Sequence, residues 1–184
     1  MKNHIISALR LTLVMLVIVG IYLGIVYAGA KILPTQGNAE TIQYKGRKFY
    51  ANIGQEFKSP SYFHGRPSAV NYNAAGSAGS NKGPSNEEYL ETVRKRIDTL
   101  TMQNPGMKDI RVPVELVTAS GSGLDPDISP EGALYQVKRI AKERNLPAEQ
   151  VEALIRKQTE QSVFGPSKIN VLKLNIALDE MQHH

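Results

Sequence analysis

The feature that most constrains this chain is an apolar run near its N-terminus. Leu11–Ala30 places 16 apolar residues in 20 positions and contains no charged side chain. As an α-helix this run would be about 30 Å long, which matches the hydrocarbon thickness of a bilayer. The sequence therefore predicts one transmembrane helix over 11–30, preceded by a short tail over 1–10, and it excludes an ordinary soluble protein.

The same run has features of a cleaved signal peptide. Lys2 and Arg10 supply a basic region before it, and Ala28-Gly29-Ala30 resembles a cleavage site. The apolar stretch is nevertheless longer than the roughly 7–15 residues usual for a signal peptide. The sequence thus favours an uncleaved anchor.

Small residues form a stripe along the expected membrane helix. Gly20, Gly24 and Ala28 fall at i, i+4 and i+8, on one helical face. Such a stripe lets a neighbouring helix approach closely, although glycine is also common in membrane helices in general. Because a third small residue extends the pattern, we expect this face to dock against another helix.

The charges flanking the apolar run do not decide its direction. Lys2 and Arg10 precede it, and four basic residues follow it closely: Lys31, Lys45, Arg47 and Lys48. A short tail before a long domain is typical of a signal anchor, and long domains are translocated largely regardless of their charge. We expect a single-pass protein of the plasma membrane with its N-terminus in the cytoplasm and its domain outside.

Composition narrows the function of the remaining chain. Residues 31–184, 154 in all, are enough to bury one core without a metal or a disulfide. The absence of cysteine excludes disulfides, a thiol nucleophile and thiolate metal sites. The net charge of +5 is modest and scattered, so the sequence predicts no nucleic-acid partner.

Residues 41–184 are predicted to form one compact α+β domain, joined to the membrane helix by a polar linker over 31–40. Thr41–Ile53 carries aromatic and apolar residues around Lys45-Gly46-Arg47, a pattern typical of a hairpin. Ser59–Asn86 is rich in Ser, Gly, Asn and Pro and predicts a long ordered loop.

Helix caps and periodicity predict the later elements. Ser85 and Glu88 indicate a capping box that opens a helix over about 86–102. The β-branched segment Ile110–Thr118 predicts an edge strand or extended segment. Two further helices are expected over Ala148–Glu160 and Leu172–Met181. A helix starting at Ser129-Pro130 should bury one face, made of Ala133, Leu134, Val137, Ile140 and Ala141.

Two glycine-rich loops share some features with anion-binding sites. Gly76–Gly83 resembles a phosphate loop, but Asn81 and Gly83 replace the residues that a P-loop needs on either side of its lysine. The second loop runs toward a helix start, yet Asp125 and Asp127 would repel a phosphate there. For both loops a structural turn is the favoured interpretation, and the aspartates lack the spacing of an EF-hand.

No catalytic set can be assembled from the sequence. His64 has serine neighbours, but no G-x-S-x-G pattern or order of nucleophile, base and acid is present. We interpret His64 and Arg66 as hydrogen-bonding supports of their loop. The residues alone therefore predict a non-enzymatic, membrane-anchored α+β module with no metal of its own.

Several motifs together resemble the C subunit of the Kdp potassium-transporting ATPase, the KdpC family. The resemblance covers nearly the whole chain and rests on motifs in the same order and spacing. Beside the anchor these are Tyr62–Ser68, Ser80-Asn81, Pro84–Asn86, Val112–Val114, Thr118–Pro126, Ile128–Pro130, Asn170–Leu172 and Leu174–Asp179.

The resemblance implies an accessory subunit without its own turnover. Its implied partners are a potassium-translocating subunit, an ATP-hydrolysing subunit and a small single-helix subunit. The implied role is a catalytic chaperone that raises the ATP affinity of the hydrolysing subunit. The implied nucleotide contact lies at Ser77, Gly79, Ser80 and Asn81, although Ala78 replaces a glycine of the family pattern and would resist a positive φ.

This role conflicts with the expected topology, because ATP is cytoplasmic and the domain is expected outside. A domain outside could instead cap the potassium entrance and stabilise the assembly. The sequence leaves both functions open: a nucleotide-affinity chaperone, and an extracytoplasmic assembly or gating module.

Overall fold

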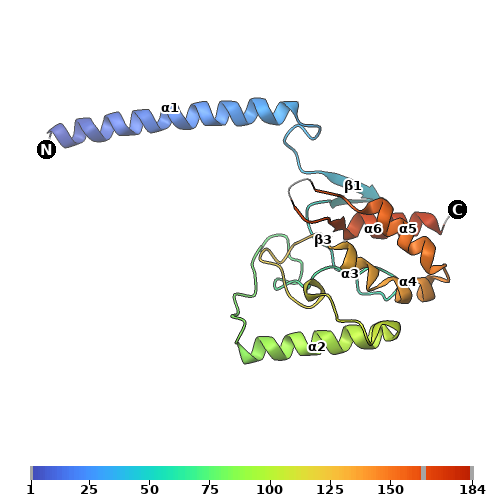
Figure 1. The fold of residues 1–184 in the computed structure, drawn as a ribbon. Coiled ribbons are helices and arrows are strands. Elements are labelled where there is room, and N and C mark those ends of the chain that lie inside the picture. The colour runs from blue at the N-terminus through green and yellow to red at the C-terminus, as the bar shows by residue number, and fades with distance from the viewer. Residues whose placement is uncertain (1, 163–164, 183–184) are drawn as a thin grey trace. The chain divides into compact units, whose positions relative to one another are not determined.

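The computed structural model describes residues 2–162 and 165–182 (Figure 1). The chain divides into two units, 1–40 and 41–184. The first unit contains helix α1 (Lys2–Ile32), whose stretch His4–Ile32 is long and apolar enough to cross a membrane. The helix extends beyond 11–30 into the predicted tail, where Lys2–Arg10 contains neither Gly nor Pro to stop it.

The second unit is a mixed α and β domain, as predicted. It begins with the hairpin of β1 (Thr41–Tyr44) and β2 (Arg47–Tyr50), paired antiparallel with Thr41 opposite Tyr50. The turn residues Lys45 and Gly46 both have positive φ, 47° and 72°. This is the backbone of a primed turn, whose twist suits a two-residue hairpin.

A long irregular segment separates the hairpin from helix α2 (Glu87–Gln103), in agreement with the sequence. The cap of α2 differs from the prediction, because Asn86 and not Ser85 is the N-cap: the Asn86 side chain accepts a 2.9 Å hydrogen bond from Tyr89 N–H. Figure 1 shows α2 at the edge of the domain. Its apolar side is only partly covered, since Leu90 and Ile97 are exposed.

The sequence predicted an edge strand or an extended segment over Ile110–Thr118, and the structure contains no strand there. A short 3₁₀-helix, η1 (Pro105–Met107), precedes this segment, and a second, η2 (Val114–Leu116), lies within it. Pro113 ends the extended part and serves as the N-cap of η2. Leu116 and Val117 are buried in the core without a strand partner, whereas Ile110 and Val114 are exposed.

The predicted helix after Ser129 is present but divided. Ser129 caps α3 (Pro130–Leu134), and α4 (Val137–Arg144) follows after a two-residue break. Leu134 is exposed, contrary to the prediction, whereas the other four residues of the expected face are buried. Helices α5 (Ala148–Gln158) and α6 (Val171–Met181) lie within two residues of their predicted bounds.

The core of the domain lies among α3–α6 and a second pair of short strands, β3 (Asp127–Ile128) and β4 (Ile169–Asn170). These strands are antiparallel, with Ile128 opposite Ile169. Both isoleucines are almost fully buried, and Phe63 joins the same cluster from the long loop. Burial of Phe63 is one of the contacts that place the irregular segment against the helices.

Candidate functional site

The segment Pro60–Arg66 is held on the helices by side chains that bind its backbone. Phe63 N–H donates to Asn175 Oδ1 at 2.8 Å, and Asn175 Nδ2 donates to Phe63 C=O at 3.0 Å. Gln136 makes the same reciprocal pair with the backbone of His64, at 2.8 and 3.0 Å. These amides replace the strand partner that the extended backbone lacks, so the loop has one defined position.

A buried arginine completes this attachment. Arg139 donates to the carbonyl oxygens of Pro60 and Tyr62, and also to Asn104 Oδ1 and Gln136 Oε1. Burial lowers the pKa of its guanidinium to about 10. The group remains a cation at neutral pH, and neutral oxygens rather than a carboxylate satisfy its donors.

The two glycine-rich loops, for which the sequence favoured structural turns over anion sites, lie against each other. Ser77 Oγ donates to Ser122 C=O at 3.0 Å. A Cβ added at Gly79 would lie 3.1 Å from Gly121 O, and one added at Gly123 only 2.6 Å from Ala78 O. We call this contact between 77–80 and 121–123 the glycine junction. Its glycines permit close backbone approach, which supports the structural interpretation of both loops.

Ser68 connects the glycine junction to the rest of the motif Tyr62–Ser68 through hydrogen bonds. Its hydroxyl donates to Gly123 C=O at 2.6 Å and accepts hydrogen bonds from Val70 N–H and Tyr72 N–H. Tyr72 in turn donates from its hydroxyl to Arg66 C=O at 2.6 Å. The motif Tyr62–Ser68 therefore connects the core helices to both glycine loops.

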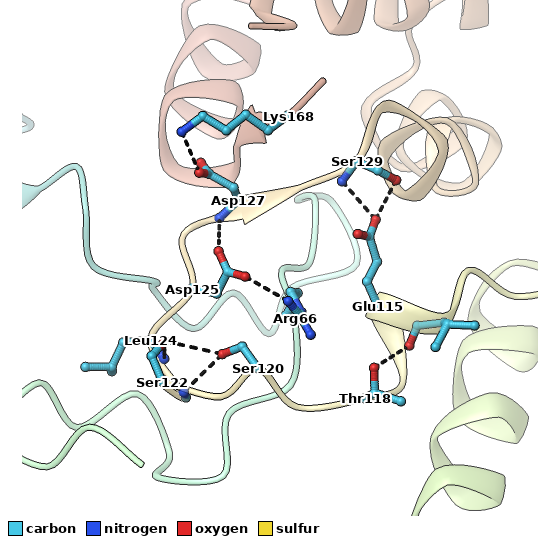
Figure 2. A network of polar contacts seen from close by, with 12 residues as sticks. Arg66, Glu115, Thr118, Ser120, Ser122, Leu124, Asp125, Asp127, Ser129 and Lys168 are labelled. Atoms are coloured by element: carbon cyan, nitrogen blue, oxygen red, sulfur yellow. Dashed lines mark hydrogen bonds and ion pairs between the residues drawn. The ribbon is translucent and has the colours of Figure 1, made fainter. Parts of the chain in front are cut away.

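Charged pairs hold the loop that follows the junction (Figure 2). Arg66 Nη1 lies 2.9 Å from Asp125 Oδ2, while Asp125 Oδ1 accepts from Asp127 N–H. Asp127 pairs with Lys168 of the neighbouring segment at 2.9 Å. The aspartates act as turn and pairing residues, as the sequence favoured, and His64 and Arg66 are hydrogen-bonded supports as predicted.

A second cluster of charged side chains in the domain was not predicted from the sequence. Asp179 on α6 accepts from Tyr44 Oη at 2.7 Å and from Tyr62 Oη at 3.0 Å, and it pairs with Lys45 and Arg144. Burial alone would raise the pKa of Asp179, but these hydrogen bonds outweigh it and lower the pKa to about 2. This carboxylate joins the hairpin, the Tyr62 motif and α4 at one point.

The predicted nucleotide residues do not all face one cavity. Ser80 lines a hollow of about 310 Å³ together with Lys82, Glu88 and Arg96, whereas Ser77, Gly79 and Asn81 are not part of its lining. Within the hollow Lys82 pairs with Glu88 at 2.8 Å. Asn81 adopts a positive φ of 52°, and Ala78 does not, so the alanine replacement causes no backbone strain here.

The predicted packing stripe of α1 is open. A Cβ added at Gly20 or Gly24 meets no atom within 4 Å, and Ala28 is exposed. At the end of the helix Lys31 Nζ lies 5.4 Å from the ring centre of Tyr27. Aromatic and basic residues in this position are typical of a membrane boundary.

Comparison with known proteins decides the family. The family model described as KdpC: K+-transporting ATPase, c chain, matches residues 5–180. The chain belongs to the KdpC family. A potassium-transporting ATPase KdpC subunit of Flavobacterium johnsoniae is 54% identical over 184 residues, covering 99% of this chain and 100% of the relative. The KdpC subunits of Flavobacterium psychrophilum and Phocaeicola vulgatus are 51% and 47% identical, over 99% and 98% of this chain.

Membership of the KdpC family makes the chain an accessory subunit of a potassium uptake complex. The polar residues that join the parts of the domain are Gln136, Arg139, Asn175 and Asp179. Arg139, Asn175 and Asp179 are polar residues on otherwise apolar helix faces, which was the available signal for them, whereas Gln136 lies in the break between α3 and α4. The described residues contain no cluster of three or more His, Cys, Asp or Glu side chains placed to hold a metal ion.

Proposed function

We propose that this KdpC-family chain is a non-catalytic subunit that α1 anchors in the plasma membrane and that acts by contact with its partner subunits. The observation that carries the proposal is the glycine junction. The backbone of 77–80 packs on 121–123, so the segment most similar to a phosphate loop is used inside the fold. The neighbouring carboxylates Asp125 and Asp127 are likewise paired internally.

The proposed contacts lie in two places. In the membrane, the stripe Gly20, Gly24 and Ala28 docks against a helix of the potassium-translocating subunit, the ATP-hydrolysing subunit or the small single-helix subunit. Outside the membrane, the domain caps the potassium entrance and stabilises the assembly. The N-terminus lies in the cytoplasm in this proposal. Membrane helix α1 has no proline, and Lys31 near its end is the one charged residue after Arg10, so an ion path along it is not proposed.

A second function is favoured by one observation. Ser80, Lys82 and Arg96 line the same hollow, where Glu88 pairs with Lys82. The two cations exceed the one carboxylate, and this excess beside a hydroxyl suits a phosphate group. In this alternative the chain lies with its domain in the cytoplasm and raises the ATP affinity of the hydrolysing subunit, which shares the bound ATP.

Steady-state ATP hydrolysis by the purified complex separates the two functions. The variant Ser80→Asp with Lys82→Glu reverses the charge of the hollow, and Lys108→Glu is a control on another exposed lysine. The contact function predicts an unchanged KM for ATP in both variants and a large loss of potassium uptake when the subunit is deleted. A tenfold or greater increase in the KM of the double variant alone would favour the nucleotide function.

A further inference from the structure

One face of the hairpin borders a hollow in the domain. Side chains alternate along a strand, and the pairing of Tyr44 with Arg47 places both on the face that also carries Phe49. These three residues line a hollow of about 420 Å³, which residues of α6 line as well. Its other aromatic and aliphatic walls are Phe57, Tyr62, Leu172 and Ile176. The hollow thus has the size and the apolar lining that are usual for a binding site.

The rings around this hollow are held in place but only partly covered. Tyr44 and Tyr62 both donate hydrogen bonds from their hydroxyls to Asp179. The ring centres of Phe57 and Tyr62 lie 5.6 Å apart. Tyr44, Phe49 and Tyr62 are nevertheless only half-buried. An apolar group that covers these rings gains free energy without first having to order the walls of the site.

One charge on the lining has no counterpart in the domain. The charged side chains of the lining are Lys45, Arg47, Glu56 and Asp179. Lys45 pairs with Asp179, and Glu56 pairs with Lys58. Arg47 is exposed and forms no ion pair with any of the described residues. The hollow therefore combines apolar walls with one exposed cation that is available to a carboxylate from outside the domain.

The covalent chain limits how far the hairpin can lie from the membrane anchor. Thr41, the first residue of β1, follows Ile32, the last residue of α1, by nine positions. Nine residues span at most about 32 Å when fully extended. Hydrogen bonds from Gln36 N–H and Asn38 N–H close turns in this linker and shorten it further. Extramembrane segments of a subunit that lies beside α1 are therefore within reach of the hairpin.

We propose that this hollow, the hairpin hollow, receives an apolar side chain from an extramembrane segment of another subunit, and that a carboxylate beside that side chain pairs with Arg47. Membership of the family makes the chain one subunit of a larger complex. An apolar anchor in a preformed pocket carries much of the binding free energy at protein interfaces. A guanidinium binds a carboxylate through two parallel hydrogen bonds. The inference rests on the proposed contact function and names the part of the domain that makes the contact.

Photo-cross-linking in the purified complex tests this proposal. Glu56 lies on the lining of the hollow at an exposed position, and it is replaced by the photoreactive amino acid p-benzoylphenylalanine. The same replacement at Lys108 and Gln150 probes exposed positions outside the hollow. Mass spectrometry then identifies each cross-linked peptide and the subunit that it comes from.

Two charge reversals on the hairpin provide a matched pair of variants. Arg47→Glu removes the proposed cation, and Lys48→Glu makes the same change at the neighbouring residue on the opposite face. The proposal predicts that position 56 cross-links to a peptide of another subunit that carries Asp or Glu beside an apolar residue. Arg47→Glu should lower this yield about tenfold, which is the effect of one lost charge-assisted hydrogen bond. Lys48→Glu should leave the yield unchanged.

A charge exchange separates a lost ion pair from a lost fold. Replacement of the located carboxylate by lysine should restore the cross-link in the Arg47→Glu complex, because the pair is then re-formed with opposite signs. Absence of this rescue, or equal loss of yield in Arg47→Glu and Lys48→Glu, would overturn the proposal.

The targets of the cross-links separate this inference from the contact function. Cross-links from position 56 only to lipid or only within this chain would overturn the proposed docking in the hairpin hollow. Cross-links to another subunit from position 108 or 150, but not from position 56, would overturn the hollow and leave the contact function intact. No cross-link to another subunit from any of the three positions would overturn the hollow and the proposed contact of the domain together.

Discussion

Arg144 Nη2 lies 2.7 Å from Asp179 Oδ1, and the two side chains are only 6% and 7% exposed. Arg144 also donates from Nε to Ser61 C=O at 2.7 Å, and its guanidinium lies 4.6 Å from the ring centre of Tyr62. The pair thereby joins α4 and α6 to the loop motif that reaches the glycine junction. Removal of Asp179 would leave the buried charge of Arg144 without its carboxylate partner.

The folded domain should lose stability in acid through Asp179. Its pKa of about 2 lies below the ordinary 3.8, so its carboxylate stabilises the fold above about pH 4. That contribution, about 2 kcal/mol, is lost as the pH falls toward 2. Thermal unfolding of the full chain in detergent between pH 7 and pH 2 measures it.

The variant Asp179→Asn should remove this part of the pH dependence. It should also destabilise the domain at pH 7 by about 3–5 kcal/mol, because Arg144 loses its partner. Asp98→Asn, at an exposed position on α2, is the control and should behave like the parent chain. If the Asp179→Asn domain loses stability in acid as steeply as the parent, groups other than Asp179 account for the pH dependence of stability.

The reciprocal pair between Asn175 and Phe63 should be essential for the position of the loop. Asn175→Ala leaves the Phe63 N–H and C=O buried without their partner, at a cost of about 1–3 kcal/mol for each unsatisfied group. Gln150→Ala, exposed on α5, should be nearly neutral. Urea unfolding monitored by circular dichroism compares them, and equal midpoints for the two variants would contradict the assignment.

The glycine junction offers a matched pair of substitutions. Gly123→Ala combines a positive φ of 67° with a Cβ 2.6 Å from Ala78 O, so we expect a loss of about 1–3 kcal/mol. Gly121→Ala meets no atom within 4 Å and should be tolerated. The same unfolding measurement tests both, and similar stability of the two variants would mean that the loops do not pack as described.

The membrane stripe predicts a different phenotype, loss of assembly without loss of the domain's fold. Gly20→Leu with Gly24→Leu should reduce co-purification with the other subunits from mild detergent, because leucine prevents close helix approach. Gly29→Leu is the control off the stripe, since position 29 faces away from position 20 on the helix. Full recovery of the complex with the double variant would count against docking through this face.

The sequence predicted those elements that local signals determine. Ser129 with Pro130, and Pro147, place helix starts because a cap or a fixed φ acts on neighbouring residues alone. The strand predicted at Ile110–Thr118 failed because burial of Leu116 and Val117 against distant helices, and not strand pairing, uses their apolar side chains. The break between α3 and α4 lies at Gln136, which binds the backbone of His64.

The candidate site was harder to predict than the helices because the residues that bind one another in it are far apart in the chain. Asp179 and Tyr44 are separated by 135 residues, and Asn175 and Phe63 by 112. No spacing rule connects such residues before the fold is known. The contact between the two glycine loops is also a tertiary one, so the sequence predicted a turn for each loop but not that the two loops pack on each other.

The side of the membrane tests the proposed function most directly. Gln161→Cys, at an exposed position of this cysteine-free chain, can be labelled with a membrane-impermeant maleimide on intact cells that express the complex. A contact function outside the membrane predicts labelling before permeabilisation. Labelling only after permeabilisation would place the domain with cytoplasmic ATP, contradict the extracytoplasmic function and favour nucleotide affinity as the role of this subunit.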